Sequence, residues 1–313
     1  MNRENRITKQ GDRLLKMPGK FDRGPVSFES RIAQREGEVM AIATRSVVSV
    51  PPTTSIMGAI EKMTECGFRR LPVTDPGTRK LRGIVTAGDI MDLMGGGSRY
   101  NLVQKKHAGN LLAAINESVR EIMTSQVVTV SGDARIQEVA DLIVEKKVGG
   151  LPIVTAGGIL EGIVTERDMM KVLSTEKRSA TVEEVMSTAL TVTTPESPIG
   201  AATRLMIGHR FRRLPVVADD VLLGIITTTD VMKYLGTGQV FQKLVTGNVA
   251  EVMSLPVRTL VSGDLHTISP ERSINDAARE MLQKNVGSLP VIEDARLVGL
   301  ITEFDLVKAF SRR

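Results

Sequence analysis

Hydrophobic and polar positions follow the same pattern in four stretches of about 55 residues, which we call copies 1 to 4. Each copy has a short apolar run, a segment with apolar residues at helical spacing, two apolar runs separated by a polar turn, and a second helical segment. In copy 2, for example, Ile136, Val139, Ala140 and Ile143 fall on one face of a helix. The pattern predicts the order β-α-β-β-α in every copy, which is an α/β fold (α+β in some schemes).

Two phrases recur at fixed spacing. Leu-Pro-Val or Leu-Pro-Ile occurs at 71–73, 151–153, 214–216 and 289–291. A phrase that ends in Thr-x-x-Asp occurs at 83–89, 162–168, 224–230 and 299–305. An isoleucine precedes every Pro by 16 residues, whereas the interval from Pro to the next phrase varies. Constant spacing with one variable interval is typical of two strands joined by a turn of variable length.

The copies resemble one another in alternation. Copies 1 and 3 share Phe-Arg-Arg before Leu-Pro-Val, and copies 2 and 4 share Thr-Glu-x-Asp. We therefore expect copy 1 to pack mainly on copy 2, and copy 3 on copy 4. The expected division is a basic, loosely ordered tail at 1–37, units at 38–94, 121–173, 184–235 and 251–313, connections at 95–120 and 236–250, and a linker at 174–183.

These phrases resemble those of the CBS domain, named after cystathionine beta-synthase. The resemblance covers nearly all of the chain beyond residue 37. It implies that two units pair through their sheets as a Bateman module. It also implies that two modules form a disc similar in layout to the gamma subunit of AMP-activated protein kinase. Modules of this family bind adenosyl ligands in clefts between paired units.

The resemblance assigns roles by position. It implies that ribose binds at Asp89, Asp168, Asp230 and Asp305. It also implies that the nucleotide faces the N-terminus of the adjoining helix at Thr86, Thr165, Thr227 and Thr302. An adenine slot is implied at Ser49, Val50, Thr129, Val130, Thr191, Val192, Thr267 and Ile268. Phosphate binding is implied at Arg69, Arg70, Arg212 and Arg213. No catalytic residue and no metal ligand is expected.

The basic pairs distinguish the clefts. We expect the arginines of copy 1 to serve the cleft of Asp168, and those of copy 3 to serve the cleft of Asp305. The clefts of Asp89 and Asp230 would face glycine-containing pairs at 149–150 and 287–288 and would lack a guanidinium.

Each assignment has a simpler alternative. Thr-x-x-Asp is also a helix-capping pattern, and one carboxylate can serve both roles. The Arg-Arg pairs could instead form a solvated edge.

The amino-acid composition excludes several kinds of site. Aromatic residues are 3% of the chain, and Cys66 is the single cysteine, so a disulfide framework and a cysteine-based zinc site are excluded. No apolar run reaches the roughly 18–20 residues of a membrane helix, so we expect a cytoplasmic protein without membrane contact.

We expect a non-catalytic regulatory protein that signals energy or metabolite state to an effector protein. Its ligand would be AMP, ADP or ATP, with S-adenosylmethionine ranked below them and no catalytic cofactor. The sequence leaves open whether the protein forms a homodimer. An enzyme is disfavoured because the repeats occupy almost the whole chain. The alternative is a nucleic-acid-binding or scaffolding protein that uses the basic tail, although acidic residues dilute its charge and no aromatic stacking platform accompanies it.

Overall fold

The computed structural model describes residues 39–95, 97–176, 178–238, 246–261 and 265–311, so the tail expected at 1–37 lies outside the described residues. Each copy contains a helix, an antiparallel hairpin and a second helix. The first helices are α3 (Ile56–Cys66), α6 (Ile136–Lys146), α8 (Ile199–His209) and α11 (Ile274–Gln283). The second helices are α4 (Ala87–Gly95), α7 (Glu166–Thr175), α9 (Thr228–Gly236) and α12 (Glu303–Ser311).

Each hairpin is a two-stranded sheet that begins at the predicted Leu-Pro phrase. The hairpins pair β1 (Arg70–Thr74) with β2 (Leu81–Thr86), β3 (Gly150–Val154) with β4 (Leu160–Thr165), β5 (Arg213–Ala218) with β6 (Val221–Thr227), and β7 (Ser288–Glu293) with β8 (Arg296–Thr302). The remaining segments contain the turns η1 (Val39–Ala41), η2 (Leu102–Lys106), η3 (Val119–Glu121) and η4 (Val257–Thr259), and the short helices α5 (Leu111–Ile115) and α10 (Val249–Ser254).

The first predicted strand of each copy is reduced to one bridge residue. In copy 1 the amide of Val50 donates to Pro72 O at 3.1 Å, and the amide of Thr74 donates to Val50 O at 2.9 Å. Pairing stops there because the chain turns at once toward α3. The parallel bridges are Val50–Val73, Val130–Ile153, Thr193–Val216 and Ile268–Val291.

These bridges correct the expected register in copy 3. The bridge residue lies six positions before the first isoleucine of the helix in every copy, which selects Thr193 rather than Val192 in copy 3. Val192 therefore occupies the position that Ser49 has in copy 1, and Thr191 lies one residue further back. The prediction of a hydroxyl side chain at this position is therefore wrong for copy 3.

Strand contacts pair copy 1 with copy 2 and copy 3 with copy 4, as predicted. The leading segment of each copy in the first pair bonds to the hairpin of the other copy. Thr44 and Ile163 exchange amide–carbonyl hydrogen bonds of 2.9 and 3.0 Å, and Thr124 and Ile84 do the same at 2.9 and 3.0 Å. In the second pair, Ser187 bonds to Leu300 in this way.

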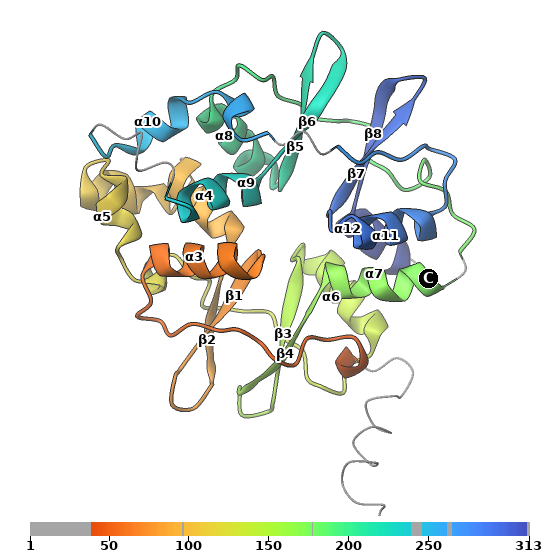
Figure 1. Cartoon of the computed structure of the whole chain (residues 1–313). Coiled ribbons are helices and arrows are strands. Elements are labelled where there is room, and N and C mark those ends of the chain that lie inside the picture. Colours follow the sequence, from red (N-terminus) through yellow and green to blue (C-terminus); the bar gives the residue numbers. More distant parts are fainter. Residues whose placement is uncertain (1–38, 96, 177, 239–245, 262–264, 312–313) are drawn as a thin grey trace, which may run out of the picture.

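The helices join different pairs of copies from those that the strands join. One apolar core joins the helices of copies 1 and 3, and a second core joins those of copies 2 and 4. The expectation that copy 1 packs mainly on copy 2 is therefore wrong for the helices. The reason is that a hairpin covers only one side of each helix, and the other side must be buried against another helix. Figure 1 shows the two helix groups at the left and right of the disc, with the hairpins between them.

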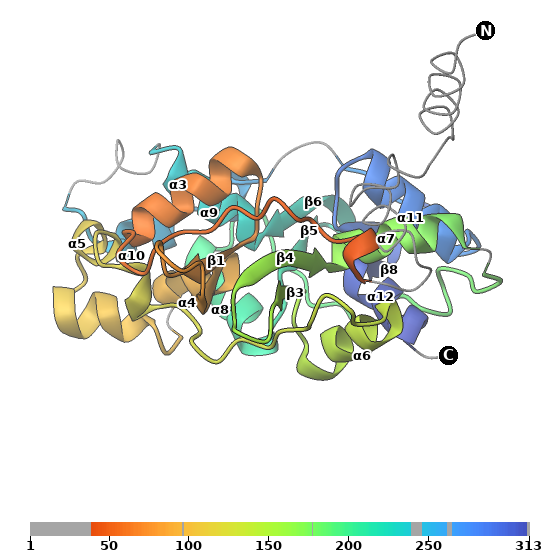
Figure 2. The same ribbon diagram turned by 90° about the horizontal axis from the view of Figure 1, so that it is seen from below.

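The molecule is a flat disc with two faces. Seen edge-on in Figure 2, α3, α7, α9 and α11 lie on one side and α4, α6, α8 and α12 on the other. We call these sides the α7 face and the α12 face. Asp168 and Asp230 belong to α7 and α9, whereas Asp89 and Asp305 belong to α4 and α12. The four equivalent carboxylates are thus divided evenly between the faces.

Within the residues that the structure describes, no helix combines the length and the apolar character that a bilayer span requires.

Candidate functional site

The four Thr-x-x-Asp junctions have the same local geometry. In copy 3 the amide and the hydroxyl of Thr227 both donate to Asp230 Oδ2, at 2.8 and 2.7 Å, and the amide of Asp230 donates to Thr227 Oγ1 at 3.2 Å. This is a capping box at the start of α9. The capping alternative is therefore correct for this threonine and aspartate. Because capping uses only Oδ2, it leaves Oδ1 available for a second role.

The second carboxylate oxygen differs between the copies. Asp168 Oδ1 accepts from Lys171 Nζ at 2.8 Å, and Asp89 Oδ1 pairs with Arg99 at 2.7 Å. Asp230 and Asp305 make no bond through Oδ1 to any part of the chain that the structure describes. Burial raises the pKa of both these carboxyls, although the threonine hydrogen bonds oppose the shift.

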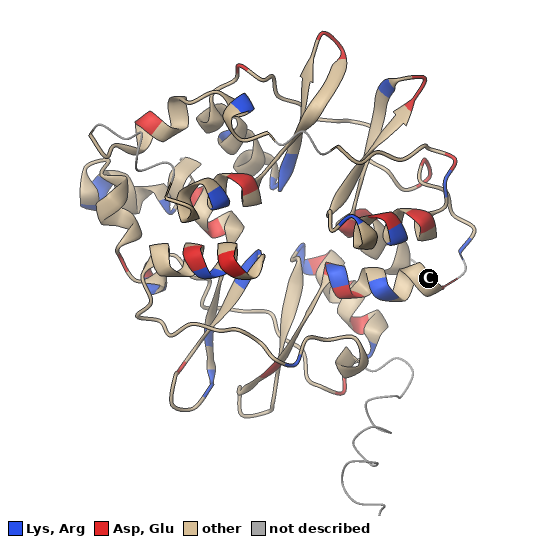
Figure 3. Cartoon of the chain, in the orientation of Figure 1, with Lys and Arg blue, Asp and Glu red and all other residues tan. Residues whose placement is uncertain are grey.

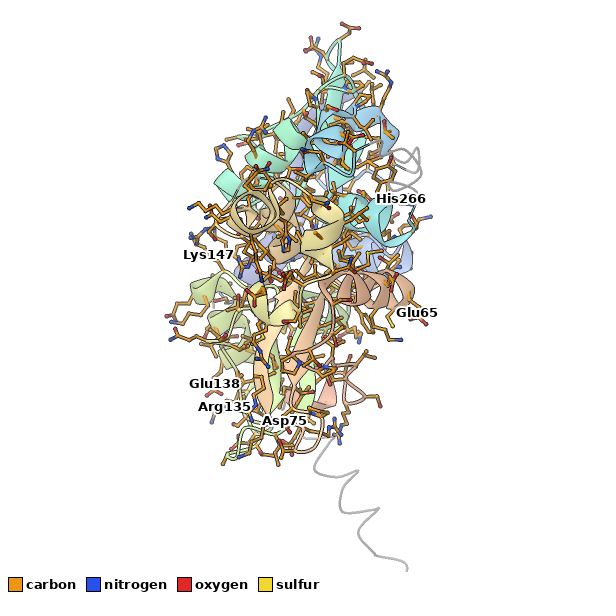
Figure 4. All side chains as sticks on the ribbon, turned by 90° about the vertical axis from the view of Figure 1, so that its left-hand side faces the viewer. Glu65, Asp75, Arg135, Glu138, Lys147 and His266 are labelled. Atoms are coloured by element: carbon orange, nitrogen blue, oxygen red, sulfur yellow. The ribbon has the colours of Figure 1, made fainter. Side chains whose placement is uncertain are left out.

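A pocket of about 550 Å³ opens on the α7 face at the centre of the disc. Its lining includes Asp168 and Thr165 of copy 2, together with Thr44 and Ser46–Val48 of the leading segment of copy 1. It also includes Asp230 and Thr227 of copy 3, together with His266 of copy 4. Figure 4 shows His266 on the same side of the disc as Glu65 of α3. All four copies therefore contribute to one cavity.

Five arginines line this pocket. They are Arg167 of α7 and the two predicted pairs, Arg69 with Arg70 and Arg212 with Arg213. Figure 3 shows basic segments at the inner ends of β1 and β5, close to the centre of the disc. The alternative of a solvated edge is wrong, because all four side chains of the predicted pairs are partly buried and line the cavity.

Two arginines of the predicted pairs are held by carboxylates of the other module, and Arg167 also contacts one of these carboxylates, that of Glu303, at 3.2 Å. Arg212 donates to Glu166 through both terminal guanidinium nitrogens, at 2.6 and 2.5 Å, and Arg69 donates to Glu303 at 2.7 Å. Both glutamate side chains are only 1% exposed. Burial opposes ionisation of Glu303, but the charges of the nearby arginines keep its pKa below the ordinary value. These pairs join copy 3 to copy 2, and copy 1 to copy 4.

The other two arginines have no such partner. The side chains of Arg70 and Arg213 make no hydrogen bond or ion pair within the described parts of the chain. Burial and the neighbouring guanidinium groups lower the pKa of each to about 10, which leaves both cationic at neutral pH. Two cations without a bound anion in a partly buried pocket are suited to phosphate groups.

Glycines make room for these guanidinium groups. A Cβ on Gly149 would collide with the tip of Arg70 and approach Arg212 Nη1 to 3.0 Å, and one on Gly287 would approach Arg213 Nη2 to 3.0 Å. The glycine-containing pairs of copies 2 and 4 are therefore complementary to the arginine pairs of copies 1 and 3. The sequence contained this signal, because each copy carries either the two arginines or the glycine with Thr-Glu-x-Asp.

The pocket revises the expected division of the clefts. Arg69 and Arg70 lie with Asp168, as expected, but Arg212 and Arg213 line the same pocket as Asp230. The expectation that the Asp230 cleft lacks a guanidinium is wrong, because the four copies share one central cavity. Asp89 and Asp305 do not line this pocket.

The expected adenine-slot residues also lie outside the lining of this pocket. Residues immediately before them, such as Val48 and His266, line it instead. Ser49 is turned toward the hairpin, where its hydroxyl lies 2.9 Å from Thr74 Oγ1. Sequence reasoning therefore missed the leading segment before Val48, which contributes Thr44, Ser46 and Val47, and it gave no role to Glu166 and Glu303.

Comparison with known proteins agrees with this architecture. The CBS domain family model matches residues 39–96, 119–175, 182–237 and 249–312. The uncharacterized protein MJ1225 of Methanocaldococcus jannaschii is 40% identical over 276 residues, which cover 87% of this chain and 99% of that protein. A protein encoded in a ribosomal RNA operon of Thermofilum pendens is 26% identical over 84% of this chain and 87% of its own length.

Solved structures extend the likeness to three dimensions. The crystal structure of MJ1225, described as a candidate archaeal homologue of g-AMPK, superimposes with a TM-score of 0.83 over 87% of this chain and 99% of that one. A Pyrococcus horikoshii protein at 20% identity shares the fold, with a TM-score of 0.57 and the same coverage. The chain therefore belongs to the CBS-domain family and carries four CBS domains, which are paired as two Bateman modules in one disc.

Proposed function

We propose that this protein is a non-catalytic regulator that binds adenine nucleotides in the central pocket of the α7 face. One observation carries the proposal: the pocket combines two carboxylates at helix N-termini, Asp168 and Asp230, with two cations that have no bound anion, Arg70 and Arg213. A nucleotide has the complementary groups, namely a ribose diol and a phosphate chain.

The chemistry of each contact follows from the geometry. Oδ1 of Asp230 accepts hydrogen bonds from ribose hydroxyls while Oδ2 keeps its place in the helix cap. The phosphates extend toward the centre of the disc, where Arg70 and Arg213 donate to them. The base lies against the leading segment opposite each carboxylate, beside Val48 at one end and beside His266 at the other.

A regulatory role is supported by how the pocket is built. The pairs Arg212–Glu166 and Arg69–Glu303 cross between the modules, and their arginines line the pocket. An anion bound at Arg70 or Arg213 therefore changes the charge balance of contacts that hold both modules together. CBS proteins are in general regulatory, and MJ1225 is described as a candidate homologue of g-AMPK. The readout is an effector protein that responds to the occupied disc.

Calorimetric titration with AMP, ADP, ATP and S-adenosylmethionine tests the proposal. We expect nucleotide binding, with S-adenosylmethionine weaker because it lacks phosphates. Asp168→Ala and Asp230→Ala each weaken binding at their own end by about 1–3 kcal/mol, since the ribose hydroxyls lose their acceptor. Asp294→Asn, on the exposed turn of the β7–β8 hairpin, is the control. Wild-type affinity in the Asp168→Ala/Asp230→Ala double variant would contradict the proposal, as would conversion of ATP to products by the purified protein.

A further inference from the structure

The copy 1 carboxylate that corresponds to Asp168 is already bound to an arginine of its own chain. Arg99, in the connection between copies 1 and 2, places one guanidinium nitrogen 2.7 Å from Asp89 Oδ1 and another 3.0 Å from Asp92 Oδ2. Asp89 Oδ2 meanwhile accepts from Thr86, as in the other capping boxes. Both oxygens of Asp89 are therefore occupied. Those of Asp168 are occupied too, but there the second partner is Lys171, whose side chain is 55% exposed, whereas Arg99 is only 25% exposed.

Copy 1 also differs from the other copies at the position three residues after the aspartate. That position is lysine in copies 2, 3 and 4, at Lys171, Lys233 and Lys308. In copy 1 it is Asp92. The lysines add positive charge beside their carboxylates, and Lys171 contacts Asp168 directly. In copy 1 two carboxylates stand together, and Arg99 is the cation that bridges them.

Arg99 is anchored on its far side by the leading segment of copy 2. Its Nε donates to Ile122 O at 2.5 Å, and a terminal nitrogen donates to Thr124 Oγ1 at 3.2 Å. Its backbone amide also donates to Asp92, at 3.4 Å. The side chain is only 25% exposed. These contacts fix the guanidinium from several directions, unlike that of a solvated surface arginine.

The position of Arg99 corresponds to the open space of the central pocket. Thr124 bonds to β2 of copy 1 in the same way that Thr44 bonds to β4 of copy 2. On the α7 face, Thr44 and Asp168 line the pocket. On the α12 face, their counterparts Thr124 and Asp89 are joined through Arg99.

We infer that Arg99 closes the Asp89 cleft to adenosyl ligands, so that the four equivalent carboxylates are not equivalent binding sites. The inference rests on the proposed function of the other clefts. A nucleotide at Asp89 would have to displace a guanidinium bound to two carboxylates and to two groups of copy 2. Its phosphates would then approach Asp92, where the other copies offer a lysine. The closed cleft is thus specific to copy 1.

Binding stoichiometry tests the closure, with adenosine as the probe. Asp89→Ala leaves the number of adenosine sites unchanged, whereas Asp168→Ala removes one. Arg99→Ala adds one site, and Arg99→Ala/Asp89→Ala removes it again. Arg120→Ala, an exposed arginine on the same connection, changes nothing. Loss of a site in Asp89→Ala, or no added site in a folded Arg99→Ala protein, would overturn the inference.

A second variant separates closure from charge. Arg99→Ala/Asp92→Lys gives copy 1 the lysine of the other copies, so the added site is expected to bind AMP at least tenfold more tightly than the added site in Arg99→Ala does. Equal AMP affinity would contradict the role given to Asp92. If Arg99→Ala fails to fold by circular dichroism, the Asp89→Ala stoichiometry alone decides. If the wild type binds neither adenosine nor AMP, ADP or ATP, the proposed function fails, and the closure then stands or falls on whether Arg99→Ala gains a site.

Discussion

The two faces of the disc carry the same motif in different surroundings. On the α7 face, Asp168 and Asp230 line a shared pocket with five arginines. On the α12 face, Asp89 is bound by Arg99, and neither Asp89 nor Asp305 lines that pocket. Since the capping geometry is the same at Asp89 and Asp230, the motif alone does not make a binding site.

What differs is supplied by segments distant in sequence. The arginine pairs come from copies 1 and 3, and the glutamates and the glycines that make room for them come from copies 2 and 4. Opposite charges therefore meet only when the modules close into the disc. The difference between Asp89 and Asp305, which lie on the same face, follows from single positions, above all Arg99 and Asp92.

The largest effect on ATP affinity is expected when the two arginines that have no carboxylate partner are removed. Arg70→Ala/Arg213→Ala removes charge-assisted hydrogen bonds of about 1.5–3 kcal/mol each, so ATP affinity falls by at least roughly tenfold per arginine. Adenosine affinity changes little because adenosine has no phosphate. Calorimetry with both ligands measures the difference, with Arg120→Ala as the control. An equal loss for ATP and adenosine would show that these arginines hold the fold rather than the phosphates.

A smaller effect is expected on stability when a buried carboxylate is neutralised. Glu166→Gln leaves Arg212 without its ion pair beside Arg70, and lowers the free energy of unfolding by about 1–3 kcal/mol. ATP should restore more stability to this variant than to the wild type, because it adds the missing negative charge. Urea unfolding with and without ATP measures this, with the exposed Glu293→Gln as the control. A variant as stable as the wild type would mean that Glu166 does not hold the arginines.

A change of one methyl group tests the space around the guanidinium groups. Gly149→Ala pushes Arg70 and Arg212 out of their positions, which costs about 1 kcal/mol and weakens ATP binding roughly fivefold. Gly208→Ala is the matched control, because its Cβ meets no atom within 4 Å in a helix. The control should bind ATP normally and be slightly more stable. Equal ATP affinity in the two variants would contradict the packing role of Gly149.

The smallest effect concerns the lysine beside Asp168. Lys171 is 55% exposed, so its ion pair contributes only about 0.3–0.5 kcal/mol. Lys171→Ala should weaken AMP binding less than about threefold, and the effect should vanish at high salt. Titration of AMP at low and high ionic strength checks this. A loss larger than tenfold would place Lys171 among the direct phosphate ligands.

Local elements of this fold could be predicted from the sequence, and contacts across the disc could not. The hairpins and the helices after Thr86, Thr165, Thr227 and Thr302 follow from repeated apolar spacing and capping residues. Periodicity does not say which helix covers another, so the packing of α3 on α9 was missed. It also does not distinguish two registers of one apolar run, so the predicted bridge residue in copy 3 was Val192 and the observed one is Thr193.

The candidate site was predicted residue by residue but not as one cavity. Arg70 and Asp168 were assigned to one cleft, and both line the central pocket. That they bind one ligand there stays a prediction. Arg213 was assigned to Asp305 alone, whereas its charge favours ionisation of both Asp305 and Asp230. Arg99 gave no signal, because its partners Asp89 and Thr124 come together only through folding of the connection.

A crystal structure of the protein grown with ADP tests the central claim most directly. The account predicts ribose density at Asp168 or Asp230, phosphates on Arg70 or Arg213, and Arg99 still bound to Asp89. Nucleotide bound at Asp89 with Arg99 displaced, or a central pocket without nucleotide at saturating ADP, would contradict it.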